Sequence, residues 1–215
     1  PADAYRFARG AELPLHPFDA AGRPSRRAQL GRPLDFAAVT DHSELFGEVQ
    51  LCQSPGQPGY DSLICRVYRG WPRIAFFVMN SRPPARFTFC GEHAEHCDAA
   101  AAVVWQRIRD AAEQAYDRSA DCRFTSFVAY EWTKSANIAD NLHRNVIFRN
   151  ERVPPLPASV VQAPTKEELW DALDRDCRAR VSGCDAVVIP HNSNISGGLM
   201  FLAEGQAGQP LDAAG

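Results

Sequence analysis

Short apolar runs recur along the chain, and several of them end abruptly in an acidic or imidazole side chain. The three clearest are 36–39, followed by Asp41 and His42; 124–130, followed by Glu131; and 186–189, followed by His191. Runs of this length, rich in β-branched and aromatic residues, predict buried strands, and 145–148 predicts another. Helical patterns lie between them. This alternation indicates an α/β domain with a largely parallel sheet, whose ligands would gather at the carboxyl ends of the strands.

The helices are predicted from their periodicity and their caps. Residues 2–10 and 61–79 are expected to be helical, and Asp98 can cap a helix over 99–115. Thr165 and Glu168 form the pattern of a capping box, which predicts a helix running to about Arg180. Residues 16–33 are rich in Pro, Gly and Arg and are expected to be a surface excursion.

A candidate metal site follows from the residues at the strand ends. Its members would be Asp41, His42, Glu131, His143 and His191. Imidazole and carboxylate together suit zinc, manganese or iron, and such metals activate water for attack on phosphoryl or similar centres. Each residue also has a plainer explanation, since histidines at strand ends often serve only as hydrogen-bonded structural groups. Glu131 could cap a loop, and Asp41 could merely orient His42.

Length, composition and charge narrow the class of protein. With 215 residues, 45% of them hydrophobic, the chain can bury the core of a single domain over 1–215. A net charge of -3 argues against a nucleic-acid partner, and no apolar run approaches the ~20 residues of a membrane helix. We expect a small polar substrate. Because the chain opens at Pro1 and closes on a Gly-rich segment, we expect it to be an internal piece of a longer protein.

The seven cysteines predict short-range disulfides. The natural pairs are Cys52 with Cys65, Cys90 with Cys97 and Cys177 with Cys184, leaving Cys122 over. Such pairs favour an oxidising compartment, a periplasm or the cell exterior, although reduced and partly buried thiols are the alternative. The segment 90–97 also holds two histidines and could wrap a zinc ion, but its spacing differs from the usual zinc motifs.

Several long strings carry a resemblance to a known family. They are Ala4-Tyr5-Arg6-Phe7-Ala8-Arg9-Gly10, residues 32–42 ending in Val39-Thr40-Asp41-His42, residues 58–62, Tyr130-Glu131-Trp132-Thr133, residues 141–149 containing Leu142-His143-Arg144-Asn145, and Ile189-Pro190-His191-Asn192-Ser193-Asn194. Over nearly its full length the chain resembles the bacterial "domain of unknown function" family 3604 (DUF3604). That family is similar to the polymerase and histidinol phosphatase (PHP) superfamily of metal-dependent phosphoesterases.

The resemblance implies a fold and a site. The fold would be a PHP-like distorted TIM-type barrel with parallel strands, here truncated at both ends. His42, Glu131, His143 and His191 would be metal ligands, with Asp41 as a ligand or its support, and the full-length protein would hold two or three zinc, manganese or iron ions. The superfamily's early His-x-His and late Asp-x-His motifs do not occur in the chain; they would lie beyond its ends, and without them the metal cluster would be incomplete.

Two functional hypotheses follow. The first is a metal-dependent hydrolase, most simply a phosphoesterase acting on a small anionic substrate. Donors for its anionic oxygen would come from Arg144, Asn145, Asn192 and Asn194, although Asn also favours turns in its own right. The second is a secreted, disulfide-braced binding module on the same scaffold without turnover.

Overall fold

The computed structural model describes residues 1–80, 84–135, 141–193, 196–198 and 200. In chain order the elements are α1 (Ala2–Ala8), β1 (Leu13–Phe18), β2 (Pro24–Ala28), β3 (Phe36–Ala38), α2 (Phe46–Gln53), α3 (Leu63–Gly70), α4 (Pro72–Asn80), a 3-10 turn η1 (Thr88–Cys90), α5 (Glu95–Ala115), β4 (Thr125–Phe127), β5 (Ala129–Ser135), β6 (Asn141–Phe148), α6 (Lys166–Leu173), a π-helical turn η2 (Asp174–Arg178) and β7 (Ala186–Pro190).

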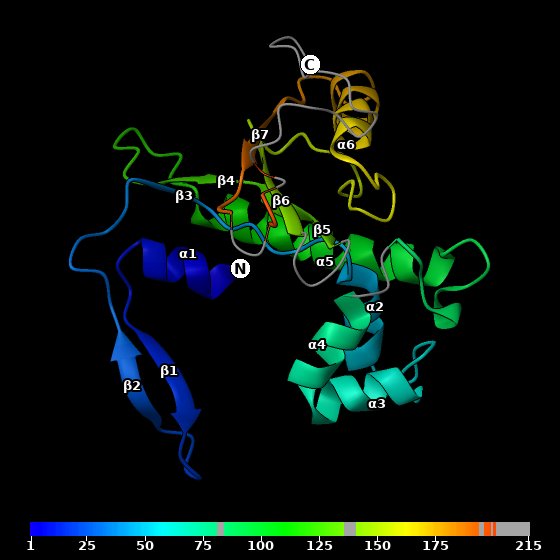
Figure 1. Ribbon diagram of the computed structural model, residues 1–215. Coiled ribbons are helices and arrows are strands. Elements are labelled where there is room, and N and C mark those ends of the chain that lie inside the picture. The colour runs from blue at the N-terminus through cyan, green and yellow to red at the C-terminus, as the bar shows by residue number, and fades with distance from the viewer. Residues whose placement is uncertain (81–83, 136–140, 194–195, 199, 201–215) are drawn as a thin grey trace.

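The strands form three small sheets. β1 and β2 make an antiparallel hairpin that projects away from the rest (Figure 1), and β3 pairs with β4 in parallel. β5, β6 and β7 form an antiparallel sheet in that order. The fold is therefore mixed α/β, with no closed barrel in the described ranges. The expected TIM-type barrel with parallel strands is wrong.

The connection between β5 and β6 explains why that expectation failed. Only residues 136–140 separate the two strands, whereas a parallel pair needs a crossover of a dozen or more residues. β6 and β7 are joined by a long connection that contains α6, yet they too are antiparallel. Apolar runs look alike in parallel and antiparallel strands when both faces of the strand are covered, so composition alone did not separate the two arrangements.

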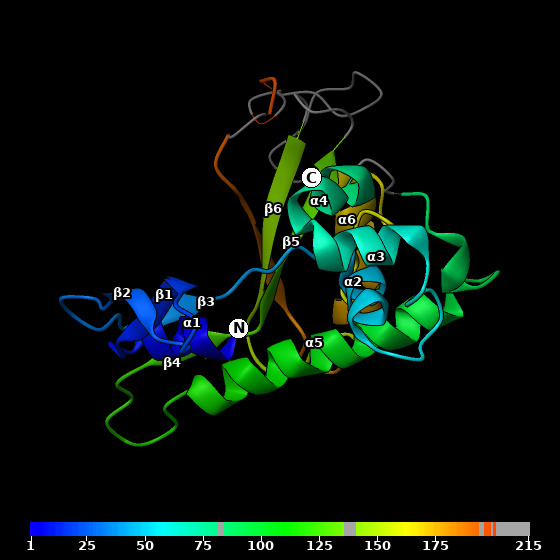
Figure 2. The same cartoon turned by 90° about the horizontal axis from the view of Figure 1, so that it is seen from below.

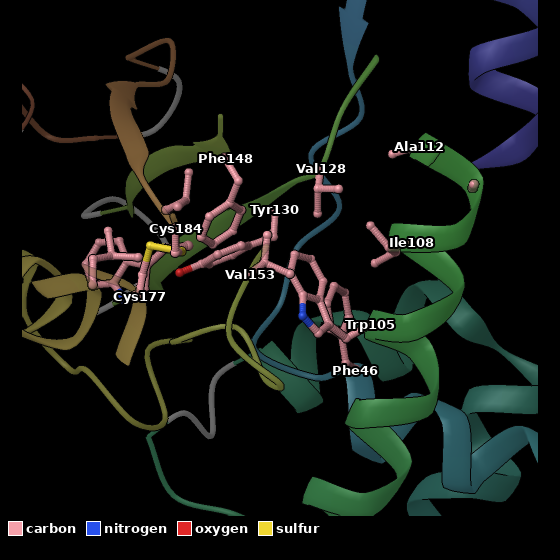
Figure 3. Close-up of a cluster of buried hydrophobic side chains, with 14 of the residues drawn as sticks. Phe46, Trp105, Ile108, Ala112, Val128, Tyr130, Phe148, Val153, Cys177 and Cys184 are labelled. Carbon is pink, nitrogen blue, oxygen red and sulfur yellow. A yellow bond between two sulfur atoms is a disulfide. The ribbon is translucent and has the colours of Figure 1, made fainter. Parts of the chain in front are cut away.

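The main hydrophobic cluster lies between α5 and the β5–β6 pair (Figure 3). Trp105 of α5 meets the ring of Tyr130 edge-on, with centroids 5.8 Å apart, and also contacts Phe148. The indole Nε1 of Trp105 donates to the carbonyl of Pro154 at 2.9 Å. Edge-to-face aromatic pairs contribute ~0.5–1.5 kcal/mol beyond their burial. This packing holds β5 against α5 at Tyr130, the residue that precedes Glu131.

Three disulfides brace the fold, and the pairing predicted from spacing is confirmed. They join Cys52 to Cys65, Cys90 to Cys97, and Cys177 to Cys184, and Cys122 is free and exposed. The first ties α2 to α3, and the third lies in the main core. In the second, both sulfurs are in the S–S bond and offer no thiolates, which argues against the zinc alternative for 90–97. The three disulfides are compatible with an oxidising, extracellular location.

The helix ends agree with the sequence only in part. Asp98, expected to cap a helix over 99–115, lies instead in the first turn of α5, which begins at Glu95. The capping box is confirmed, since Thr165 Oγ1 accepts from the N–H of Glu168 and the Glu168 carboxylate accepts from the N–H of Thr165. The single helix expected over 61–79 is instead two, α3 and α4, separated by Trp71. Pro72 follows a residue with φ of -137° and cannot continue a helical hydrogen-bond ladder.

After α5, the carboxylate of Asp117 accepts the backbone N–H groups of Ser119 and Arg123, which closes the turn into β4. In the part of the chain that the structure describes, no helix combines the length and the apolar character needed to cross a membrane.

Candidate metal centre

A side chain that follows β3 meets two side chains of the β5–β6 hairpin. His42, Glu131 and His143 each place one ligand atom within 4.8 Å of the others. Glu131 lies in β5 and His143 in β6, while His42 follows the segment that leaves β3. The view of Figure 2 shows that segment running up to β5 and β6. The sequence prediction thus placed these three residues together correctly, although their role as ligands stays a prediction.

Backbone pairing explains how the three residues meet. His42 and Glu131 form an isolated parallel bridge, in which the N–H of Glu131 donates to the carbonyl of Asp41 at 2.9 Å. Ser43 then donates through both its N–H and its hydroxyl to the carbonyl of Glu131. In the β5–β6 register His143 lies opposite Thr133, two residues from Glu131 and therefore on the same face.

The Glu131 carboxylate is the centre of the cluster. Its Oε1 lies 2.7 Å from Nδ1 of His143 and 3.5 Å from Nε2 of His42. The hydroxyl of Thr133 donates to the same oxygen at 2.8 Å. The other oxygen, Oε2, lies 4.0 Å from Nε2 of His191, whose backbone N–H donates to the carbonyl of His143. His191 therefore borders the cluster, with its ring centroid 5.3 Å from that of His143.

The donor set fits a divalent ion. With Nδ1 of His143 held by Glu131, its Nε2 is buried and has no hydrogen-bond partner among the residues that the structure describes. Among the described residues, Nδ1 of His191 is likewise buried without a hydrogen-bond partner. Buried nitrogens with lone pairs or protons left unpaired are costly, and a metal ion is one way of satisfying them. Imidazole nitrogen beside carboxylate oxygen is the set preferred by zinc, manganese and iron.

The surroundings lower the pKa of the Glu131 carboxyl and raise the pKa of the half-exposed His42 imidazole. Burial acts to raise the pKa of Glu131, but its hydrogen bond with His143, the charge of His42 and the Thr133 hydroxyl outweigh burial, so this pKa is lowered. The pKa of His42 is raised, chiefly by its hydrogen bond to Glu44, against the opposing effect of burial. A cation is thus already favoured next to Glu131, and a metal ion would take the place of the proton.

Two supporting residues were missed from the sequence. The side chain of Glu44 is 4% exposed, and its carboxylate lies 3.0 Å from Nδ1 of His42. This contact orients the His42 ring so that its Nε2 faces Glu131. A carboxylate that orients a ligand histidine in this way is common behind metal sites. Thr133 orients both Glu131 and His143. Thr133 could have been found from the sequence, because alternate residues of a strand share a face and Thr133 is two residues from Glu131.

The remaining predicted residues occupy varied positions. The Asp41 side chain is exposed and lies outside the three-residue group, although its carbonyl supports Glu131. Asn145 faces Glu131 across the β5–β6 pair, and its Oδ1 is buried without a partner within the described ranges. Asn192 is exposed, and Asn194 lies outside the described residues.

Arg144 follows His143 directly, so the strand pleat turns it to the opposite face of the sheet. Its guanidinium donates to the carbonyl of His143 and to the sulfur of Met200, and burial lowers its pKa. It therefore lies away from the cluster, and its role in substrate binding stays a prediction.

Comparison with known protein families identifies the family of the chain. The family described as "Protein of unknown function (DUF3604)" matches residues 1–215. The search of curated proteins and the search of solved structures returned no match.

Proposed function

The chain belongs to the DUF3604 family, and we propose that it is a metal-dependent hydrolase, most simply a phosphoesterase. One observation carries this proposal: the buried His143 has an unpartnered Nε2, within the described residues, beside the ionised carboxylate of Glu131 and the imidazole of His42. A similarity of the site to the PHP superfamily, with two or three ions in the full-length protein, is part of the same proposal.

The roles of the chain's own groups follow from their contacts. Glu131, His42 and His143 would hold the ion, and His191 would complete or border the set. Glu44 orients His42, and Thr133 orients Glu131 and His143, so the donors need little rearrangement. A divalent ion bound there would supply a Lewis acid for the ester oxygen and would lower the pKa of a bound water molecule to about 7.

Substrate contacts are assigned by position. Asn145 lies on the same strand face as His143 and has a buried, unpartnered oxygen in the described part of the chain, which suits a hydrogen bond from a water molecule or a substrate hydroxyl. A small anionic substrate would be attracted by the cation. The three disulfides favour a periplasmic or secreted protein as the setting for this chemistry.

The test is metal analysis and turnover with the full-length protein and a His143→Ala variant. The variant should lose most of its bound zinc or manganese and its activity on a panel of phosphomonoesters, phosphodiesters and sulfate esters. His93→Ala is the matched control, because His93 is an exposed histidine of the Cys90–Cys97 loop and should leave both readouts unchanged.

Each outcome separates the hypotheses. Unchanged metal content in His143→Ala would refute the proposed metal centre. Metal that depends on His143, together with no turnover of any ester class by the wild type, would instead favour the binding module.

A further inference from the structure

An apolar cleft adjoins the metal centre. Its volume is about 380 Å³, and His42 forms part of its wall together with its neighbours Asp41 and Glu44. Hydrophobic side chains from α2, α4, α5 and the residue preceding α2 make up much of the remainder: Leu45, Phe46, Val49, Phe76, Val104 and Ile108. His42 is thus shared by the metal cluster and the apolar cleft, and its side chain is 48% exposed. A molecule bound at the cluster could extend into the cleft without passing through packed core.

Three of the polar side chains around the apolar cleft each donate a hydrogen bond within the protein. Arg107 donates to Gln50, Gln53 donates to the hydroxyl of Tyr68, and Asn80 donates to the carbonyl of Phe76, at 2.9, 3.0 and 2.9 Å. A sugar or a peptide would need several convergent groups to replace its own hydrogen bonds to water. An apolar group needs none and gains from leaving water.

Phe76 is one of several exposed apolar side chains of α4, with Ile74, Phe77 and Val78, and it lines the apolar cleft. Its side chain belongs to α4, whose residues Ala75 and Met79 are buried against the Cys52–Cys65 disulfide. The Phe76 ring, in contrast, is 56% exposed and lines the apolar cleft. A large aromatic ring on a cleft wall provides a stacking surface for a ligand.

We propose that the apolar cleft receives the organic group of the substrate, so that the substrate is an anionic ester of an uncharged aryl alcohol. Its charged end would lie at His42, Glu131 and His143, and the inference rests on the proposed function. The volume is near the lower end of ligand sites, about 300–1,000 Å³, and suits a group of one or two rings. The carboxylate of Asp41 on the wall disfavours a second anionic group there.

Hydrolysis of such an ester consumes only water. For a phosphate ester, the water oxygen bonds to phosphorus and the bond from phosphorus to the ester oxygen breaks. A proton from the water ends on the alcohol product, which would be released from the apolar cleft.

The first test measures binding in the absence of turnover. Full-length protein treated with a chelator should bind 1-naphthol, the product alcohol of a naphthyl ester, in a calorimetric titration. Phe76→Ala should weaken this binding roughly fivefold, since one aromatic contact is lost. Phe36→Ala is the control, because Phe36 is 66% exposed but lines a different apolar cavity beside β3. Absence of naphthol binding, or binding that depends on Phe36 instead of Phe76, would overturn the assignment.

The second test compares 1-naphthyl phosphate with methyl phosphate as substrates of the metal-loaded enzyme. Phe76→Ala should lower kcat/KM for the naphthyl ester roughly fivefold and leave the methyl ester unchanged, because only the larger group reaches the ring. Equal effects on both esters would overturn the cleft assignment alone. A wild-type protein that binds no metal and hydrolyses neither ester would overturn the proposed function, and the leaving-group role with it.

Discussion

Replacing Glu44 with glutamine should weaken zinc binding about tenfold while the fold is kept. The Glu44 carboxylate lies 3.0 Å from Nδ1 of His42, is almost fully buried, and directs Nε2 of that ring to Glu131. Glutamine preserves the shape but removes the charge. A hydrogen bond to a charged group contributes about 1.5–3 kcal/mol and a neutral one about 0.5–1.5 kcal/mol. The difference, ~1–1.5 kcal/mol, corresponds to roughly a factor of ten in affinity.

The assay is a competition titration of zinc against a fluorescent chelator, with thermal unfolding of the same samples. Glu48→Gln is the matched control: Glu48 is also buried and close in sequence, but it pairs with Arg86 at 2.8 Å. That variant should lose stability and keep its zinc affinity. Wild-type zinc affinity in Glu44→Gln would refute the role assigned to this carboxylate.

Three further predictions concern the fold. Trp132→Phe removes a buried donor to the carbonyl of Ala163, so urea unfolding should show a loss of about 1–3 kcal/mol; an unchanged midpoint would contradict it. Gly47→Ala would place a Cβ 2.0 Å from the carbonyl oxygen of Cys97, so little soluble folded protein is expected by gel filtration; normal yield would refute this close packing. The hydrogen bond from the Ser119 side chain, followed by those from the backbone N–H groups of Arg123 and Ser119, lowers the pKa of Asp117 to about 2. The contribution of Asp117 to stability is therefore present above pH 3.8 and is lost as the pH falls toward 2. Melting curves of Asp117→Asn should accordingly show a deficit at pH 7 that disappears near pH 2, and a deficit independent of pH would argue against it.

The sequence predicted local structure well where a local signal decides it. The capping box at Thr165 and Glu168 marked the start of α6, and short spacing identified all three disulfides. The sequence-based prediction failed where the structure of a segment depends on which other strand it pairs with. The hairpin of β1 and β2 has mostly exposed positions and therefore no alternating apolar pattern, and the excursion expected over 16–33 hid it.

The sequence selected three residues that lie together, but it did not predict how they are arranged, and their role as ligands stays a prediction. His42, Glu131 and His143 were selected because they end or begin apolar runs, and they do meet. They meet through a parallel bridge and an antiparallel hairpin, whereas the carboxyl edge of a parallel sheet was expected. Glu44 escaped notice because its importance depends on burial beside His42, which only tertiary packing creates.

The three disulfides and the proposed metal centre would constrain the chain over different distances. Each disulfide joins residues separated by 13 or 7 positions, so all three restrict only local segments of the unfolded chain. An ion held by His42 and His143 would instead close a loop of about a hundred residues, for which the entropy removed from the unfolded state is larger. Loss of such an ion, if one is bound, should therefore loosen the contact between the segment after β3 and the β5–β6 hairpin, while each disulfide-bonded local segment stays cross-linked.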